Sequence, residues 1–314
     1  MPADRTCPGG ICRPDKIVVM ENAPSVAHAV LALELLPAVA FGFAEERLAR
    51  TISRWNVFLQ IAAPAVLVLP YVILAISYRI LRWEWIAFYA LLPVAMAWLM
   101  KQAGVADPEQ RGNWRDALIL LTLGFAVDLR WFDVAWPAGL RGWGNLLLVD
   151  AGLYAFLGIR QLSGTGFNFH FRWSDWKMGF RELLFFAPVV ILLGLVLGFI
   201  HPHHNTPAIW KAALGWIGIF VFVAVPEELF FRAWVQNLLE RRVGRMPALL
   251  LASILFGLSH FNKRNLGSSH FNWRYVLLAT IAGIFYGRAW REQRRVPASG
   301  ITHTCVDWLW YLWF

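Results

Sequence analysis

The sequence predicts an all-α protein, a polytopic transmembrane helix bundle of about eight helices. Hydrophobic residues make up 58% of the 314 positions and charged residues only 16%, whereas soluble domains are typically about 45–50% apolar and about 25% charged. Segments 57–78 and 183–200 contain no charged side chain, and each is close to the ~20 residues that cross a ~30 Å hydrocarbon core as a helix. The 18 tryptophans often stand beside loop arginines, as in Arg82 and Trp83, which is typical of the aromatic belt at a membrane surface.

Apolar runs separated by charged loops define the expected helices. In chain order the candidate spans are 26–44, 57–80, 85–100, 116–136, 143–159, 180–200, 208–239, 246–261, 274–290 and 298–314. Three of the five spans before residue 160 carry acids: Glu34 is in the first, Asp128 in the fourth and Asp150 in the fifth. Because a charge in the bilayer costs at least ~2.5–3.5 kcal/mol, these three segments are expected at the membrane surface or packed against other helices.

The longest polar stretch, residues 161–177, divides the chain. We expect N-terminal transmembrane helices of unassigned role over 26–160 and the functional domain over 180–314. Residues 1–25 are expected to form a polar leader, in which Cys7 and Cys12 lack the second half of a metal motif. With three cysteines in all, no disulfide framework is indicated, and the leader lacks the features of a cleavable signal peptide.

Positive charge is distributed in short clusters between the apolar runs, for a net charge of +9. Nucleic-acid binders instead concentrate Lys and Arg along one face, so this pattern argues against a nucleic-acid partner. It favours contact with the anionic leaflet of a lipid bilayer. The basic loops 241–245 and 288–295 are expected on one side of the membrane, the cytoplasmic side by the positive-inside rule. We expect an integral, multi-pass protein of a plasma membrane, such as the bacterial inner membrane.

Ionisable side chains gather in the apolar helices of the C-terminal third, where each is a functional candidate because burial is costly. Residues four apart lie on one face of a helix, and this spacing gives three pairs: Glu228 with Arg232, Phe256 with His260, and His303 with Asp307. Glu227 points about 100° away from Glu228 on a helix of 3.6 residues per turn. It is therefore left outside the ion pair and is the better candidate for a general base.

Depth along the helices also relates these residues. Glu227 lies fourteen residues before Arg241, and His260 lies fifteen after Arg245, so both are ~20 Å from the same basic loops at ~1.5 Å per residue. His303 follows the second basic loop at a shallower but overlapping depth. Three separate helices can thus present an acid and two imidazoles at similar depth.

The three pairs, read in order, form the motifs Glu-Glu-x-x-x-Arg, Phe-x-x-x-His and His-x-x-x-Asp. They resemble the CAAX protease and bacteriocin-processing family of intramembrane peptidases, over about residues 180–314; residues 1–160 resemble no family. The resemblance implies an endopeptidase whose substrate is a membrane-associated or prenylated protein or peptide. It also implies that Glu227 activates a water with help from His260, and that His303 and Asp307 steady the oxyanion.

Within this resemblance, Glu228 belongs to the catalytic set together with Glu227, His260, His303 and Asp307, while Arg232, which holds Glu228 in register, and Phe256 are structural support. Asp307 replaces the Asn of some relatives, and an anion beside an oxyanion would repel it unless Asp307 orients His303. Its role stays open. A zinc cofactor also stays open, because Glu227, His260 and His303 make a two-His, one-carboxylate set that could bind zinc and a water. The chain has no His-Glu-x-x-His motif, and direct glutamate catalysis is favoured.

Two other functions fit buried acids and histidines. A proton-coupled transporter also uses them as relays, but the halves show no internal repeat or paired broken helices. An inactive membrane scaffold of the same fold is the third interpretation, and intact motifs weigh against it.

Other matches to these residue types are expected to be structural. Residues 45–50 fit the first motif, but no histidine motif completes it, and they are expected to form a membrane-flanking loop. The remaining histidines are expected in solvated loops or at the surface: His201, His203 and His204 beside prolines, and His28, His170 and His270 alone.

Overall fold

The computed structural model describes residues 25–203, 205–261, 263 and 271–314, and every regular element in this part of the chain is a helix. The prediction of an all-α bundle is confirmed. The expected polar leader with Cys7 and Cys12 lies outside the described residues, apart from Ser25. His204 and His270 also lie outside them.

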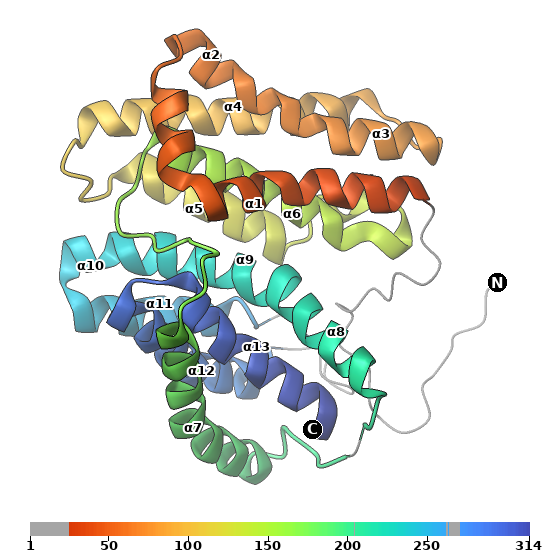
Figure 1. Cartoon of the computed structure of the whole chain (residues 1–314), viewed down its shortest axis with the longest axis vertical. Coiled ribbons are helices and arrows are strands. Elements are labelled where there is room, and N and C mark those ends of the chain that lie inside the picture. Colours follow the sequence, from red (N-terminus) through yellow and green to blue (C-terminus); the bar gives the residue numbers. More distant parts are fainter. Residues whose placement is uncertain (1–24, 204, 262, 264–270) are drawn as a thin grey trace.

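The helices of the N-terminal half form the upper layer in Figure 1. They are α1 (Ser25–Ser53), α2 (Val57–Ala62) continued by a 3₁₀ helix (Ala63–Val68), α3 (Leu69–Ser77), α4 (Trp83–Ala106), α5 (Trp114–Asp128), two 3₁₀ turns (Asp133–Ala135 and Ala138–Trp143), and α6 (Gly144–Leu153) with a π-helical continuation (Tyr154–Ile159). The span expected over 116–136 is shorter than predicted. It ends at Asp128 because Arg130 adopts a left-handed conformation with φ 54°.

The helices of the C-terminal half form the lower layer. They are α7 (Trp173–Val196), α8 (Ile209–Ile219), a π-helical segment (Phe220–Ala224), α9 (Val225–Glu228), a second π-helical segment (Leu229–Gln236), α10 (Asn237–Val243), α11 (Arg245–Leu258), α12 (Trp273–Gln293) and α13 (Val296–Trp313). Residues Ile209–Val243 form one continuous helical rod in which α-helical and π-helical segments alternate.

Six helices in the described residues are long and apolar enough to cross a membrane: Ser25–Ser53, Val57–Ser77, Trp83–Ala106, Ala138–Ile159, Trp173–Val196 and Ile209–Val243. The protein is therefore an integral, multi-pass membrane protein. The basic loops lie at the same end of the bundle, as predicted, because Arg291 Nη1 donates to the carbonyl oxygen of Arg245 at 3.5 Å. The assignment of that end to the cytoplasm stays a prediction.

Aromatic packing joins the two layers in the apolar interior. The Phe156 ring, which follows α6, stacks on the Trp234 indole with centroids 4.9 Å apart and planes 19° apart. Gly152 allows this approach, because a Cβ atom there would lie 2.5 Å from the Trp234 ring. The N-terminal half thus supports the π-helical segment that follows Glu228.

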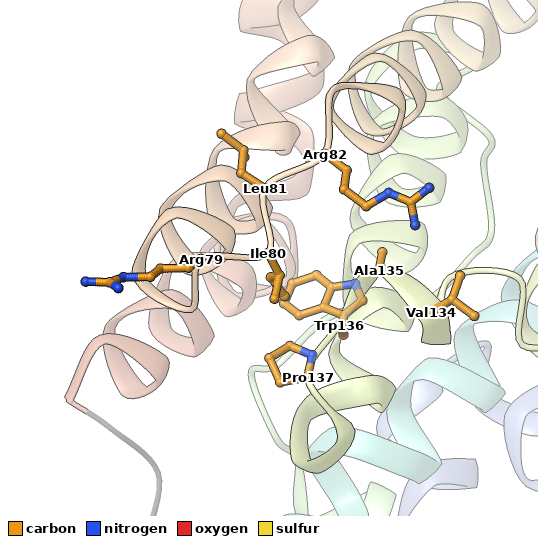
Figure 2. A pocket seen from close by; sticks show the side chains of 8 residues that line it. All are labelled: Arg79, Ile80, Leu81, Arg82, Val134, Ala135, Trp136 and Pro137. Carbon is orange, nitrogen blue, oxygen red and sulfur yellow. The ribbon is translucent and has the colours of Figure 1, made fainter.

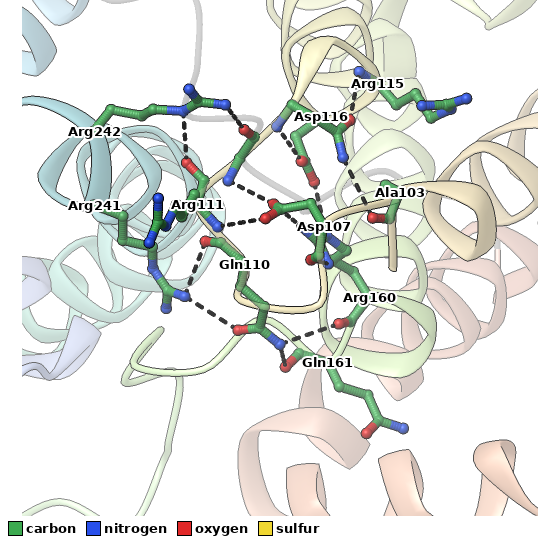
Figure 3. Close-up of polar contacts among 12 residues, drawn as sticks. Ala103, Asp107, Gln110, Arg111, Arg115, Asp116, Arg160, Gln161, Arg241 and Arg242 are labelled. Carbon is green, nitrogen blue, oxygen red and sulfur yellow. Dashed lines mark hydrogen bonds and ion pairs between the residues drawn. The ribbon is translucent and has the colours of Figure 1, made fainter. Parts of the chain in front are cut away.

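A polar junction closes the basic end of the bundle (Figure 3). The Arg160 side chain, 1% exposed, donates to Asp107 at 2.6 Å and to Asp116 at 3.1 Å. Arg160 thereby connects the end of the π-helical segment that follows α6 to both sides of the α4–α5 turn. Burial alone would raise the pKa of Asp107, but backbone N–H groups of that turn and the Arg160 guanidinium hold it below its ordinary value.

The same turn is bound to the C-terminal half. Arg241 Nη1 donates to the carbonyl oxygen of Gln110 at 3.1 Å, and Arg242 Nε donates to that of Arg111 at 3.0 Å. Both arginines belong to α10, at the end of the rod that carries Glu227 and Glu228. The position of that rod is therefore fixed from the N-terminal half by polar contacts as well as by aromatic stacking.

Candidate active site

The first motif lies where the rod changes its helical pitch. Glu227 and Glu228 end α9, a single α-helical turn between two π-helical segments. π-helical turns are rare and often occur at functional sites. A uniform helix was expected over 208–239, whereas the structure has π-helical segments at Phe220–Ala224 and Leu229–Gln236. Arg232, in the second of these segments, still bonds to Glu228.

Glu228 is fully buried and is bonded from two sides. Its Oε2 accepts a hydrogen bond from Arg232 Nε at 3.1 Å, and its Oε1 lies 2.9 Å from His303 Nδ1. Because an ionised carboxylate can only accept, Nδ1 carries the proton in this contact. Glu228 therefore joins the first motif to the third and fixes the orientation of the His303 ring.

The other nitrogen of His303 faces the remaining two acids. Nε2 lies 3.8 Å from Glu227 Oε2 and 3.6 Å from Asp307 Oδ2. The side chain of His303 is 4% exposed, whereas that of Glu227 is 21% and that of Asp307 32% exposed. A buried imidazole thus presents one nitrogen toward two carboxylates at the accessible side of the cluster.

Aromatic rings enclose the imidazole of His303. The Tyr286 ring stacks on it with centroids 4.5 Å apart and planes 17° apart, and Phe256 meets it edge-on at 5.8 Å. The guanidinium of Arg232 lies over the other side of Phe256, 5.2 Å from its centroid. Tyr286 could not be predicted as a site residue from the sequence, because a tyrosine in an apolar helix belongs to no recognisable motif.

His260 packs against the same group of aromatic rings. Its Nδ1 lies 2.8 Å from the backbone oxygen of Phe256, and its ring is 4.9 Å from Phe256 and 4.8 Å from Tyr275. A carbonyl oxygen can only accept, so Nδ1 is the protonated nitrogen and neutral His260 has its lone pair on Nε2. Phe256 is 2% exposed, and it places both imidazoles from one position in the core.

Comparison with known proteins identifies the segment that carries these residues. Residues 209–309 match the type II CAAX prenyl endopeptidase Rce1-like family. This segment is an Rce1-like domain. It runs from α8 into α13 and contains all three motifs, so the expected family is confirmed. Comparison with curated proteins and with solved structures returned no match.

The matched segment is about a third of the chain, and at the level of the family it supports a CAAX-type intramembrane endopeptidase that acts on membrane-associated peptides. Among the described residues, no group of three or more His, Cys, Asp or Glu side chains is placed to bind a metal ion. The zinc cofactor stays a prediction, and removal of metal by a chelator tests it.

The copy of the first motif at residues 45–50 lies outside the Rce1-like domain. It forms the last turns of α1 beyond a kink at Ala44, and is helical where a loop was expected. Glu45 accepts a hydrogen bond from Thr165 at 3.4 Å. The ion pair of Arg50 with Glu46 is exposed.

The isolated histidines lie at the surface or in loops. His28, His170 and His201 are exposed. His203, in the loop before α8, is half-buried, and its backbone N–H donates to the carbonyl oxygen of Trp313 at 2.9 Å.

Proposed function

We propose that the protein hydrolyses a peptide bond of a prenylated, CAAX-type or other membrane-associated protein or peptide, in a plasma membrane such as the bacterial inner membrane. The observation that carries the proposal is the environment of His303. Its Nδ1 is committed to buried Glu228, and its Nε2 faces the partly exposed carboxylates of Glu227 and Asp307.

In the proposed reaction Glu227 is the general base. Its partial exposure suits a group that meets water, whereas Glu228 is fully buried and bonded to Arg232. Glu227 takes a proton from the attacking water, assisted by the Nε2 lone pair of His260. The water oxygen bonds to the peptide carbon, and the proton passes to the leaving nitrogen as the C–N bond breaks. General acid–base catalysis of this kind contributes about 10²–10⁴-fold.

His303 is assigned to the oxyanion. We assign His303 as the imidazolium, protonated on Nδ1 toward Glu228 and on Nε2 toward Glu227 and Asp307. Its Nε2–H, held in place before the reaction, stabilises the negative charge that develops on the carbonyl oxygen. Glu228 holds the ring from its Nδ1 side, as buried carboxylates orient catalytic imidazoles elsewhere. Asp307 is four residues beyond His303 and near the same Nε2, so we assign it to orienting the ring before substrate enters.

Peptide cleavage by the purified full-length protein in detergent tests the assignment. Fluorogenic peptides with a CAAX-type C-terminus, prenylated and unprenylated, are the substrates. Glu227→Gln keeps the size and removes the base, so the rate is expected to fall by about 100-fold or more. His260→Ala is expected to lose a similar amount, and the double variant little more, because residues that act as a unit are not additive.

The chain supplies a matched control for this experiment. Glu45→Gln makes the same change in the incomplete copy of the motif and is expected to stay within a few-fold of wild type. An active Glu227→Gln enzyme would overturn the assignment of the base. Loss of activity with a zinc chelator and its return with added Zn²⁺ would replace the direct mechanism by a metal-dependent one. A folded wild-type protein that cleaves none of the peptides would support the scaffold interpretation.

A further inference from the structure

A charged cluster lies outside the candidate active site, where α7 packs against α12. Glu182, on α7, has a fully buried side chain although α7 is one of the candidate membrane spans. Its Oε1 accepts hydrogen bonds from Arg181 Nε at 3.1 Å and Nη2 at 2.7 Å, and its Oε2 lies 3.1 Å from Arg288 Nε on α12. One buried carboxylate therefore holds two guanidinium groups together, and the mechanism proposed above uses none of the three.

The two arginines face the outside of the bundle. Their side chains are 44% and 40% exposed, whereas the carboxylate between them is covered. A guanidinium has five N–H donors, and only part of them is directed at Glu182. No other acceptor among the described residues bonds to Arg181 or Arg288. The remaining donors of both groups are therefore available to a ligand on the outer surface.

The surface around this cluster is apolar. Phe180, Leu184 and Phe185, which flank Arg181 on α7, all have exposed side chains. Because α7 is long and apolar enough to cross a membrane, this face is expected to contact the acyl chains of lipids. An arginine on such a face is costly unless its charge is paired or reaches the headgroups.

The cluster also lies close to the basic end of the bundle. Gln293 Nε2, at the end of α12, donates to the carbonyl oxygen of Ser174, in the first turn of α7, at 3.2 Å. Arg181 is seven residues beyond Ser174 and Arg288 is five before Gln293, which is about 8–11 Å from that bond at ~1.5 Å per residue. Long arginine side chains extend over such a depth to keep their charge at the headgroups. Both guanidinium groups are therefore within reach of lipid phosphates.

We propose that Arg181 and Arg288 bind the phosphate group of an anionic phospholipid, whose acyl chains lie on the apolar face of α7. Glu182 balances only one of the two arginines, and the exposed Lys177 and Glu292, one turn nearer the basic end, cancel each other. One phosphodiester supplies the single negative charge that the cluster lacks, and guanidinium groups bind phosphate oxygens in a bidentate manner. A zwitterionic headgroup would bring its own cation to the same place.

Another pair of arginines, at the end of α4 opposite to the polar junction, provides a comparison. Arg79 and Arg82 line a pocket of about 390 Å³ together with Trp136 (Figure 2). Arg82 Nε donates to Glu84 Oε1 at 2.6 Å, and Figure 2 shows the Arg79 side chain extending in the other direction. These two guanidinium groups are not held together by one carboxylate, so they are not expected to bind one phosphate.

Thermal unfolding of the purified full-length protein in dodecylmaltoside, followed by its tryptophan fluorescence, tests the site. The protein is titrated with anionic dioleoylphosphatidylglycerol, with zwitterionic dioleoylphosphatidylcholine, or with glycerophosphate, which has the phosphate but no acyl chains. A ligand at a hundred times its dissociation constant shifts the unfolding equilibrium about 100-fold. A saturable rise of several degrees in the melting temperature is therefore expected with the anionic lipid alone.

Variants locate the effect. Arg181→Gln removes the excess charge and leaves Glu182 paired with Arg288, so this variant is expected to fold and to lose most of the shift. Arg79→Gln makes the same change in the other arginine pair and is expected to retain it. Native mass spectrometry counts the phospholipids that remain bound, and one fewer phosphatidylglycerol is expected on Arg181→Gln than on wild type. This count does not depend on the stability of the variants.

Three results would overturn the proposal. The first is an equal shift with both phospholipids, or no shift with either. The second is a full shift in Arg181→Gln, or its loss in Arg79→Gln. The third is an equal shift with glycerophosphate, which would mean that the cluster binds free phosphate instead of a lipid.

Discussion

Replacing Glu228 by Gln perturbs both contacts that organise the candidate active site. Glu228 and Arg232 are both 0% exposed, with Nε and Oε2 3.1 Å apart. Removing one partner of a buried ion pair costs about 3–5 kcal/mol, because the other charge stays buried alone. Glutamine keeps the volume and one acceptor oxygen, so we expect the low end, about 3 kcal/mol. This is about a 100-fold change in the unfolding equilibrium.

The same substitution is expected to slow cleavage. Glutamate offers one oxygen to Arg232 and the other to His303, whereas glutamine has only one acceptor oxygen. It can serve Arg232 or His303 but not both. If it serves Arg232, its amide N–H₂ faces the Nδ1–H of His303 and the ring turns away from Glu227.

Thermal unfolding and peptide cleavage, measured on the same preparations, separate the two effects. The double variant Glu228→Gln with Arg232→Met removes the unpaired charge, and apolar replacement of a buried pair is often neutral or stabilising. Its melting temperature is expected to recover, while its cleavage rate stays low because His303 still lacks a carboxylate. Wild-type stability and wild-type cleavage in Glu228→Gln would refute both roles of this residue.

Three further predictions concern the supports of the site. Gly152→Ala places a Cβ 2.5 Å from the Trp234 ring and is expected to lower the free energy of unfolding by about 1–3 kcal/mol. Gly139→Ala is the control and is expected to leave that free energy unchanged, because nothing lies within 4 Å of the new atom. Chemical denaturation measures both variants. Tyr286→Leu removes the ring stacked on His303 and is expected to lower kcat/KM about 3–10-fold, from the ~0.5–1.5 kcal/mol of an aromatic pair, while Tyr286→Phe keeps the rate. Although burial acts to raise the pKa of Asp107, the turn N–H groups and Arg160 hold it low. The stabilisation from its ionised form is therefore present above about pH 4, the unfolded value, and is lost as pH falls through the folded pKa. Melting temperatures between about pH 5 and pH 3 are thus expected to fall less steeply in Asp107→Asn.

Local patterns in the sequence determined the membrane class, the family and the contacts within each helix. The apolar runs predicted the bundle because their length matches the bilayer. The spacing of four predicted that Arg232 bonds to Glu228 and that Asp307 lies near His303, because helix geometry alone brings such residues onto one face. The placement of the two basic loops at one end also followed from their positive charge, and the Arg291 contact with Arg245 agrees with it.

The tertiary structure decided which side chains meet across helices. The bond from His303 to Glu228 joins residues 75 positions apart, and the stacking of Tyr286 on His303 depends on how α12 and α13 pack. The periodicity of a helix shows which face a residue occupies but not which other helix covers that face, or at what height and angle. Contacts between helices therefore remain undetermined until the whole bundle has packed.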